Sequence, residues 1–255
     1  MTMDLDFKKY QATGNDFIII EADQLSPERN YSDIAKKICP RRIGIGADGI
    51  IIIESKGAER DYAMQYYNAD GSGPIMCGNG ARASLHYVHQ YINKKEQYNF
   101  LAPDGHHQGL IDGNMVEITM QDADTIDTIE INSETAYLLN TGAPHLVIFD
   151  EITKGRDIKK IARPLRNKYD ANVNFINQNK DGDWQIRTYE RGVEDETLAC
   201  GTGITASALV MVREKGQCFP IELEARGGKL KVREKAQKIW LSGEALQVYS
   251  GNILL

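Results

Sequence analysis

The feature that most constrains the fold of this chain is a short motif that occurs twice. Residues 74–88 read PIMCGNGARASLHYV and residues 198–211 read LACGTGITASALVM, so Cys-Gly-x-Gly-x-x-Ala-Ser recurs with its cysteines, Cys77 and Cys200, 123 residues apart. Two further similar segments, TGNDFIII from Thr13 and TGAPHLVIF from Thr141, recur 128 residues apart. Similar features in the same order and at nearly the same separation indicate two duplicated halves.

The length of the chain is compatible with this duplication. A chain of 255 residues can form one large domain or two of ordinary size. We therefore expect an N-terminal half over residues 1–122 and a C-terminal half over residues 123–245, with the boundary inside the acidic segment MQDADTIDTIEI. The closing segment, residues 246–255, is a candidate strand that returns to the first half.

Most of the chain outside the two motifs predicts short strands. Segments such as DYAMQYYNADG, GLIDGNMVEITM and GGKLKVREKAQKIWLSG combine alternating or β-rich runs with turn residues. Apolar residues spaced by three or four positions predict one helix after each motif cysteine, at Ala81, Leu85, Val88 and Ile92 and at Ile204, Ala208 and Met211. Two shorter helices are predicted over residues 32–38 and from an Asp157 cap to a stop before Pro164.

These elements predict an α+β fold. Each of two pseudo-symmetric domains is expected to be a mixed, mostly antiparallel sheet wrapped around a central helix. The helices that follow the cysteines contain alanines and are apolar enough to be enclosed by the strands.

The composition narrows the class of function. Charged residues make up 26% and hydrophobic residues 42%, with neither a long uncharged apolar run nor a signal-like N-terminus, so we expect a soluble, cytoplasmic protein with no membrane partner. The net charge is −6 and no basic block occurs, which argues against a nucleic-acid partner. The four cysteines lie far apart without a C-x-x-C pair, which is typical neither of a disulfide framework nor of a zinc site.

A cysteine at the start of a helix has a specific chemistry. Unpaired backbone N–H groups and the positive end of the helix dipole both stabilise a thiolate, which lowers a thiol pKa that is otherwise about 8.5. The flanking glycines let the backbone approach a ligand and leave N–H groups that can hold a carboxylate. Two such motifs facing each other across a bound molecule would provide the opposed acid/base groups that inversion at a carbon requires. The pattern therefore predicts a racemase or epimerase.

Other interpretations of the same residues stay open at this point. Isolated cysteines are often buried core residues, and we assign Cys39 and Cys218, which lack flanking glycines, to packing. The stretches GIGADG, GNGARA and GTGITA fit a loose phosphate-binding pattern, although that pattern needs a βαβ unit to be specific. A nucleotide-binding module and a non-catalytic small-molecule binding protein are therefore the alternatives from a different class.

Eight segments in a specific order make the chain resemble the diaminopimelate epimerase family along essentially its whole length. They are ATGNDF, RRIGIGADG, NADGSGPIMCGNGAR, TGAPHLV, NVNF, YERGVEDETLACGTG and the closing GGKLKV with SGEALQVYSGNI. The resemblance implies a diaminopimelate epimerase-like fold of two domains with the site between them. It also implies a PLP-independent isomerase, without metal or other cofactor, that interconverts L,L- and meso-diaminopimelate in lysine and peptidoglycan precursor biosynthesis.

The resemblance also assigns site residues. Cys77 and Cys200 resemble the two acid/base thiols, one acting as thiolate while the other is a thiol, and such a pair titrates as a coupled unit. His145 and Glu190 resemble polar residues that support the thiols. The implied substrate-binding residues are Asn15, Asn68, Asn172, Glu190 and Arg191 through their side chains, and Gly78, Asn79, Gly201 and Thr202 through their backbone N–H groups. Arg191 would hold the distant carboxylate in a bidentate fork, and the N–H groups would stabilise charge as the α-proton leaves.

Two positions depart from the family pattern. Gly73 stands where an acidic residue is frequent, and Ala143 stands where many members have an asparagine that contacts the substrate. Both positions concern how the distal part of the substrate is recognised. Another cofactor-independent racemase, of the proline, hydroxyproline or histidine type, is the alternative within the same fold, although a proline-sized site has no use for Arg191.

The remaining expectations concern two aspartates and the partners. Asp16 and Asp70 lie in turn sequences, where an aspartate usually caps its own loop. The expected partner is the small-molecule substrate, and the sequence leaves a homodimer open.

Overall fold

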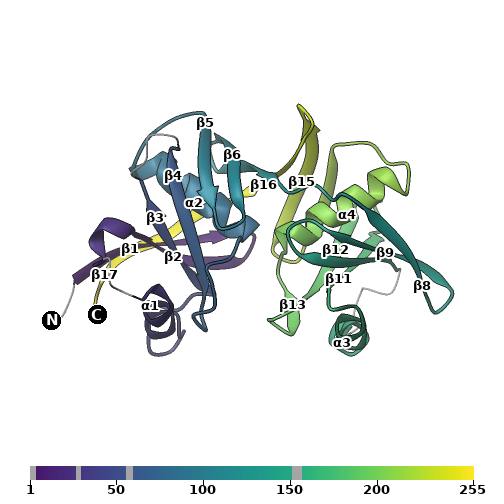
Figure 1. The fold of residues 1–255 in the computed structure, drawn as a ribbon, viewed down its shortest axis with the longest axis horizontal. Helices are drawn as coiled ribbons and strands as arrows, with labels where there is room; N and C mark the ends of the chain where they lie inside the picture. Colours follow the sequence, from purple (N-terminus) through teal and green to yellow (C-terminus); the bar gives the residue numbers. More distant parts are fainter. Residues whose placement is uncertain (1–3, 27–29, 56–59, 151–156) are drawn as a thin grey trace. The chain divides into compact units, whose positions relative to one another are not determined.

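The chain divides into two units. The computed structural model describes residues 4–26, 30–55, 60–150 and 157–255. Contacts cluster into Met1–Ile118 with Gly243–Leu255, called unit 1, and Thr119–Ser242, called unit 2. The chain leaves unit 1 within strand β7 (Met115–Met120) and returns within β16 (Lys238–Glu244) (Figure 1).

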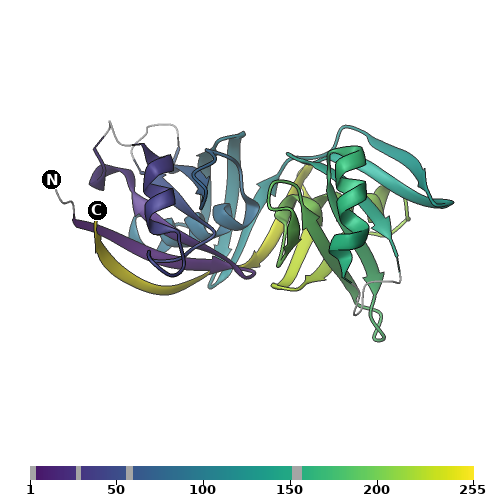
Figure 2. The same cartoon turned by 90° about the horizontal axis from the view of Figure 1, so that it is seen from below.

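The described residues of unit 1 form a mixed sheet in the order β17–β1–β2–β3–β4–β5–β6–β7. Besides β7, its strands are β1 (Asp4–Ala12), β2 (Asn15–Glu21), β3 (Gly49–Glu54), β4 (Tyr62–Asn68), β5 (Gln97–Ala102), β6 (Gly105–Asp112) and β17 (Leu246–Leu254). The last strand of the chain therefore pairs with the first, antiparallel, and Figure 2 shows the yellow β17 running beside the purple β1.

Unit 2 has a matching sheet in the order β8–β9–β10–β11–β12–β14–β15–β16. Its strands are β8 (Ile126–Ile131), β9 (Glu134–Asn140), β10 (Pro144–Phe149), β11 (Asn172–Gln178), β12 (Trp184–Glu190), β14 (Ile221–Ala225) and β15 (Gly228–Lys235), with the short β13 (Asp195–Thr197) beside β12.

The two sheets repeat one pattern of strand direction. In each, the successive pairings are antiparallel, antiparallel, parallel, antiparallel, parallel, antiparallel and antiparallel. In unit 1 the first place in the order is filled by β17, from the far end of the chain, whereas in unit 2 it is filled by β8. The predicted α+β fold of two pseudo-symmetric domains is confirmed.

A central helix lies against each sheet, and each begins directly after a motif cysteine. These helices are α2 (Gly78–Tyr91) and α4 (Gly201–Arg213), and Cys77 and Cys200 are their N-caps, with extended backbone. Strands of both ends of the unit 1 sheet contact α2, among them β1, β2, β4 and β6, and β9, β10, β11, β14 and β15 contact α4. Eight consecutive residues of α2, from Gly78 to Leu85, are buried, as expected for a helix enclosed on all sides.

A second helix covers the other face of each sheet. α1 (Tyr31–Ile38) packs on a cluster that includes Ile18, Ile20, Ile50 and Ile52, and α3 (Ile158–Tyr169) packs on Leu146, Ile148, Val173 and Phe175. Side chains alternate between the faces of a strand, so a sheet covered on both faces needs an unbroken apolar run. This explains why Ile50–Ile53 are four buried isoleucines in succession.

The predicted stop of the fourth helix before Pro164 is wrong. Asp157 does cap α3, accepting a hydrogen bond from the Lys159 N–H at 3.1 Å, but the helix continues through Pro164 to Tyr169. A proline inside a helix loses one hydrogen bond and crowds the preceding turn, a cost of about 3 kcal/mol. The helix continues because side chains on both sides of the proline pack in the same cluster on the sheet: Ile158, Ala162, Leu165 and Tyr169.

Candidate active site

The thiol of Cys77 lies at the first turn of α2 among amide groups. The Gly80 N–H donates to Cys77 Sγ over 3.4 Å, which is the side-chain cap of the helix. Asn15 Oδ1 lies 3.8 Å from the same sulfur, on the other side, and can accept the proton of a thiol. Cys77 therefore has a donor that favours the thiolate and an acceptor that favours the thiol.

The orientation of Asn15 is fixed by a carboxylate. Its Nδ2 donates to Asp48 Oδ2 over 2.6 Å, so the amide oxygen must face Cys77. The same oxygen accepts from Asn79 Nδ2 at 3.4 Å. Asn15, Asn79 and Cys77, three residues that the sequence assigned to the site, are thus brought together in unit 1.

Asp16 and Asp48 belong to an ion-pair network behind Asn15. Asp16 accepts from Lys9 at 2.6 Å and from Arg41 at 2.7 and 2.9 Å, and Arg41 also donates to Asp48 Oδ1 at 2.7 Å. Burial alone would raise the pKa of Asp16, but the bonds from Arg41 and Lys9 outweigh it and hold that pKa well below its usual range. The expected loop-capping role of Asp16 is therefore wrong, because Lys9 from the neighbouring strand and Arg41 from a later segment converge on its carboxylate.

The other aspartate behaves as expected. Asp70 Oδ1 accepts from the Ser72 N–H at 2.8 Å and caps its own loop. In the same loop Asn68 donates to Ser72 Oγ at 2.8 Å and accepts from the Tyr66 hydroxyl at 2.9 Å. Asn68 is therefore oriented by its loop and by β4.

The thiol of Cys200 has a hydroxyl neighbour. Cys200 Sγ lies 3.4 Å from Thr202 Oγ1, and His145 Nε2 lies 2.9 Å from that same hydroxyl. The turn that precedes His145 also bonds to the first turn of α4, because the Thr141 hydroxyl donates to the Thr202 carbonyl at 2.9 Å. Cys200, Thr202 and His145 are thus brought together in unit 2.

The protonation state of His145 follows from its neighbours. Asn174 Nδ2 donates to the carbonyl of Leu146 at 3.2 Å, an atom that only accepts, and lies 3.0 Å from His145 Nδ1. The amide nitrogen therefore faces the ring, Nδ1 accepts, and the ring hydrogen is on Nε2, which donates to Thr202 Oγ1. Burial and the nearby Arg191 charge lower the pKa of His145 to about 3, so the ring is neutral at physiological pH.

This chain of bonds leaves the Thr202 hydroxyl hydrogen for the sulfur. Because Thr202 Oγ1 accepts from His145, its own hydrogen can point towards Cys200 Sγ, where it stabilises a thiolate. His145 therefore acts on Cys200 through the Thr202 hydroxyl.

The remaining polar residues of unit 2 gather at the end of β12. Asn172 Oδ1 accepts from the Arg191 N–H at 2.9 Å and its Nδ2 donates to the Pro144 carbonyl at 3.1 Å. Arg191 Nη1 donates to Asp170 Oδ2 at 2.9 Å, and Glu190 Oε1 accepts from the Thr197 hydroxyl at 2.6 Å. The Arg191 side chain is 37% exposed, so its guanidinium can reach a ligand.

Three residues that sequence reasoning missed orient the side chains of predicted site residues. They are Asp48, Asn174 and Arg82, which orient Asn15, His145 and Asn79 respectively. Asp48 and Arg82 lie inside the quoted motifs, and Asn174 lies two residues after Asn172 on β11. The period-two alternation of a strand was the available signal for Asn174, since it places both asparagines on one face.

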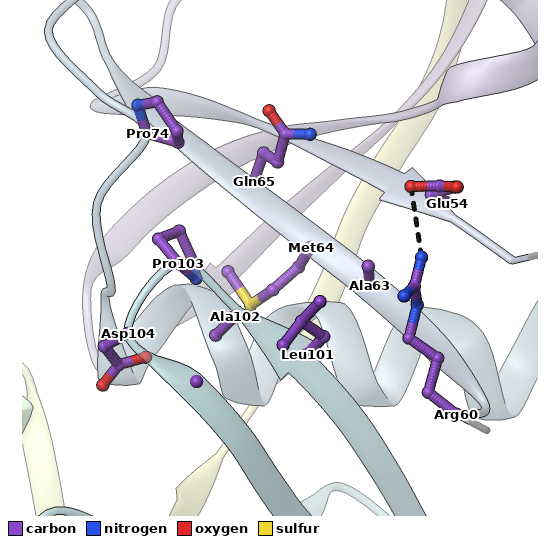
Figure 3. Close-up of a pocket in the computed structure, with 11 residues that line it drawn as sticks. Glu54, Arg60, Ala63, Met64, Gln65, Pro74, Leu101, Ala102, Pro103 and Asp104 are labelled. Atoms are coloured by element: carbon purple, nitrogen blue, oxygen red, sulfur yellow. Dashed lines mark ion pairs between the residues drawn. The ribbon is translucent and has the colours of Figure 1, made fainter. Parts of the chain in front are cut away.

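The pocket drawn in Figure 3 is not the candidate site. It has a volume of about 630 Å³ and lies in unit 1 on β4 and the β5–β6 turn, where Arg60 pairs with Glu54 at 3.5 Å. Met64, Leu101 and Pro103 form its apolar part (Figure 3). None of its lining residues belongs to the predicted site, so we base the function on the cysteines.

The other two thiols differ from the motif pair. Cys39 is buried, and burial raises its pKa to about 12, so it is an inert core residue. Cys218 is exposed, so its assignment to packing is wrong. Among the described residues no group of three or more His, Cys, Asp or Glu side chains is arranged as a metal site, and none of the described helices is long and apolar enough to cross a membrane.

Sequence comparison identifies relatives over nearly the whole chain. The model of the family described as diaminopimelate epimerase matches residues 7–125 and 137–251. The diaminopimelate epimerase of Flavobacterium psychrophilum is 38% identical over 96% of this chain and 98% of its own length. That of Campylobacter lari is 43% identical over 79% of this chain and 80% of its own length.

Solved structures share the fold at low sequence identity. A PhzF-family phenazine biosynthesis protein of Enterococcus faecalis has a TM-score of 0.76 at 17% identity, covering 99% of this chain and 100% of its own. A hydroxyproline epimerase of Agrobacterium vitis has a TM-score of 0.71 at 12% identity, covering 99% of this chain and 93% of its own. At such identities these neighbours establish the fold alone.

Proposed function

The chain belongs to the diaminopimelate epimerase family, and from that premise we propose that Cys77 and Cys200 are the two acid/base groups of its reaction. The protein is an isomerase that interconverts L,L- and meso-diaminopimelate, a PLP-independent step of lysine biosynthesis.

One observation carries the proposal. Cys77 and Cys200 are the N-caps of the two central helices, at equivalent places in two units that share one strand pattern. A buried core cysteine has no reason to recur in this position, whereas a pair of acid/base groups does. Each sulfur also has a hydrogen-bond donor that supports a thiolate, the Gly80 N–H for Cys77 and the Thr202 hydroxyl for Cys200.

The proton steps balance with two thiols. One cysteine, as thiolate, takes the α-proton from one face of the carbon, and the other, as thiol, gives its proton to the opposite face. The negative charge passes from the first sulfur to the second, and no redox change is needed. The N–H groups of Gly78 and Asn79, or of Gly201 and Thr202, hold the reacting carboxylate while charge develops on it.

The supporting residues have distinct tasks in this proposal. His145 stays neutral and fixes the Thr202 hydroxyl, which then donates to Cys200. Glu190, which accepts from Thr197, lies next to Arg191 in the chain and receives an ammonium group of the substrate. Arg191 binds the distant carboxylate, and Asn172 holds the Arg191 backbone. Asn15 and Asn68 bind ammonium groups from unit 1.

The cellular context is a further part of the proposal. The enzyme works on a free small molecule in the cytoplasm. A homodimer stays a prediction. Ala143 and Gly73 have no polar side chain. The distal part of the substrate is therefore bound by Asn172, Glu190 and Arg191.

Proton NMR of L,L-diaminopimelate in D₂O tests the proposal first. Reduced, dialysed protein without added PLP or metal should remove the α-proton signal and produce the meso isomer. Exchange with proline, hydroxyproline or histidine, but none with diaminopimelate, would favour the alternative racemase. No exchange with any amino acid, from protein whose thiols are free, would favour a binding protein.

A further inference from the structure

An arginine is buried beside the catalytic turn of unit 1 without a carboxylate partner. Arg82 has no exposed surface, and among the described residues no acidic side chain forms an ion pair with it. Its hydrogen-bond partners are neutral: the Thr13 hydroxyl at 2.9 Å, Asn79 Oδ1 at 3.0 Å and the Gly78 carbonyl at 3.4 Å. Its buried Nε has no hydrogen-bond partner. A buried charge without a counter-charge is strongly unfavourable, so this guanidinium requires an explanation.

The guanidinium lies at the N-terminal turn of α2. Helical side chains point back towards the start of the helix, and the bonds of Arg82 to Gly78 and Asn79 agree with that direction. Asn79 in turn donates to Asn15 Oδ1, the oxygen that lies 3.8 Å from Cys77 Sγ. The charge of Arg82 is therefore one side chain removed from the polar groups around the sulfur.

Other charges around α2 are already paired or exposed. On the strands that contact α2, Asp16 is bonded to Lys9 and Arg41, and Glu21 accepts from the Tyr87 hydroxyl at 2.6 Å. The other acidic residues of these strands are exposed: Asp4, Asp6, Glu54 and Asp112. Several titratable rings that face α2 or lie on it have hydrogen-bond partners other than Arg82: Tyr10, Tyr62, His86, His89, Tyr91 and His107. Cys77 directly precedes Gly78, whose carbonyl accepts from Arg82, and the charge of Cys77 acts on the guanidinium.

We propose that the buried Arg82 guanidinium is the counter-ion of a Cys77 thiolate, so that the resting enzyme carries its negative charge on Cys77 and its proton on Cys200. Arg82 is then a positioning residue that acts on the thiol through charge and through Asn79. This inference rests on the proposed role of the two cysteines. Burial lowers the pKa of Arg82 to about 10, while Cys77 acts in the opposite direction, so the arginine stays charged at neutral pH.

Unit 2 lacks this cation at the equivalent place. Thr205 stands 123 residues after Arg82, and its hydroxyl donates to the Gly201 carbonyl at 3.0 Å where Arg82 donates to Gly78. His145 is neutral, and Arg191, the cation that acts on His145, is partly exposed and paired with Asp170. Solvent weakens the field of an exposed, paired cation far more than that of a buried one.

The negative charge changes place during the reaction cycle. When Cys77 removes the α-proton and Cys200 delivers its own, the charge moves to Cys200, away from Arg82. After product release a proton passes from Cys77 to Cys200 by way of solvent, and the resting form returns. Substrate that requires a Cys200 thiolate must wait for the opposite transfer.

Alkylation by iodoacetamide at a series of pH values tests the inference, because only the thiolate reacts. Cys77 is followed in Cys200→Ala protein and Cys200 in Cys77→Ala protein, by mass spectrometry of the modified peptide. We expect the midpoint for Cys77 to lie about one pH unit or more below that for Cys200. Adding Arg82→Met to Cys200→Ala should raise the Cys77 midpoint by about one unit, which is about tenfold slower alkylation below the midpoint.

Two further variants separate charge from structure. Arg82→Lys keeps the charge and should keep the low midpoint, whereas Thr205→Val, the matched change in unit 2, should leave the Cys77 midpoint unchanged. A midpoint for Cys77 equal to or above that for Cys200, which needs no arginine variant, would overturn the inference even if Arg82→Met does not fold. An unchanged midpoint in folded Arg82→Met would overturn it as well. Epimerisation by either single-thiol protein would instead contradict the proposed function, and the alkylation curves would still decide the role of Arg82.

Discussion

The two units support their thiols with the same backbone and different chemistry. In unit 1, Phe17 pairs with Gly49 across β2 and β3, and Ile51 lies two residues further along β3. In unit 2 the matching pair is His145 and Asn172 across β10 and β11, and Asn174 lies two residues further. The helix that carries Cys77 therefore lies on Phe17 and Ile51, and the helix that carries Cys200 lies on His145 and Asn174.

The two central helices differ in the polar side chain that each one buries. α2 contains the buried cation Arg82 and packs on an apolar pair, whereas α4 contains Thr205 and packs on a neutral hydrogen-bonded pair. An identical backbone motif therefore places two thiols in unequal electrostatic surroundings. The difference suits a reaction in which one sulfur starts as thiolate and the other as thiol, since a symmetric pair would not fix which one holds the proton.

The largest effect should come from removing either thiol. Cys77→Ala and Cys200→Ala should each lower the rate of epimerisation by about a thousandfold or more, because general acid or base catalysis contributes about 10²–10⁴. Both variants should keep the wild-type circular dichroism spectrum, since both side chains are only partly buried. Formation of the meso isomer, followed by chiral chromatography, measures the loss. Substantial turnover by one variant would mean that the two thiols are not both required, so the two units would not have equivalent catalytic roles.

The glycines of the two motifs should respond unequally to alanine. A Cβ at Gly203 would lie 2.4 Å from Asn174 Oδ1 and 3.2 Å from His145 Cε1, whereas a Cβ at Gly80 would lie no closer than 3.4 Å to Cys77 Cβ or Ile51. We expect Gly203→Ala to lower the free energy of unfolding by about 2–3 kcal/mol and kcat/KM by about a hundredfold.

Gly80→Ala is the matched control in unit 1. It should change the free energy of unfolding by less than about 1 kcal/mol, because a helical glycine replaced without a clash gains rigidity. Urea unfolding and steady-state kinetics measure both variants. Equal losses of stability and activity in Gly203→Ala and Gly80→Ala would contradict this prediction. They would mean that His145 and Asn174 can move aside for a new Cβ as easily as Phe17 and Ile51.

Acid should destabilise unit 2 through His145. Below pH 6.5 the unfolded chain binds a proton at this residue that the folded unit, with a His145 pKa of about 3, does not bind. The unfolded state then holds more protons, so the free energy of unfolding falls as the pH falls, by up to about 1.4 kcal/mol per pH unit. Between pH 7 and pH 5 the wild-type protein should lose about 2 kcal/mol more than His145→Gln.

The chain provides its own probe for this measurement. Both tryptophans, Trp184 and Trp240, and a single histidine, His145, fall within Thr119–Ser242. Urea unfolding followed by tryptophan fluorescence therefore reports on unit 2. Parallel pH profiles for wild type and His145→Gln would show that His145 is protonated in the folded unit, contrary to its neutral role beside Thr202.

Sequence reasoning was most successful where the information is local. The duplicated motif, the strand segments and the helices after the cysteines depend on neighbouring residues, and the structure confirms the α+β fold they predict. Asn174 and Asp48 were missed because their tasks depend on contacts between distant segments. Arg82 was missed although its bond to Asn79 is local, because its burial and its bond to Thr13 depend on the fold. Asp16 was misjudged for the same reason, since Lys9 and Arg41 reach it from other elements. Pro164 shows the same limit, because tertiary packing outweighs its local preference.

The smallest effect should come from Arg191, where the units differ in what they offer the substrate. β12 ends in Glu190 and Arg191 follows it, whereas β4 ends in Asn68 and Ala69 follows it, so unit 2 alone has the planar fork at this place. Arg191→Lys should weaken binding of diaminopimelate about tenfold, because a point charge cannot form two parallel bonds to a carboxylate. Calorimetry on a Cys77→Ala background measures affinity without turnover. Asp170→Asn is the control: it removes the ion pairs of an exposed carboxylate with Arg191 and Arg166 and should change affinity less than about threefold. Unchanged affinity in Arg191→Lys would assign the distant carboxylate to another residue and remove this difference between the units.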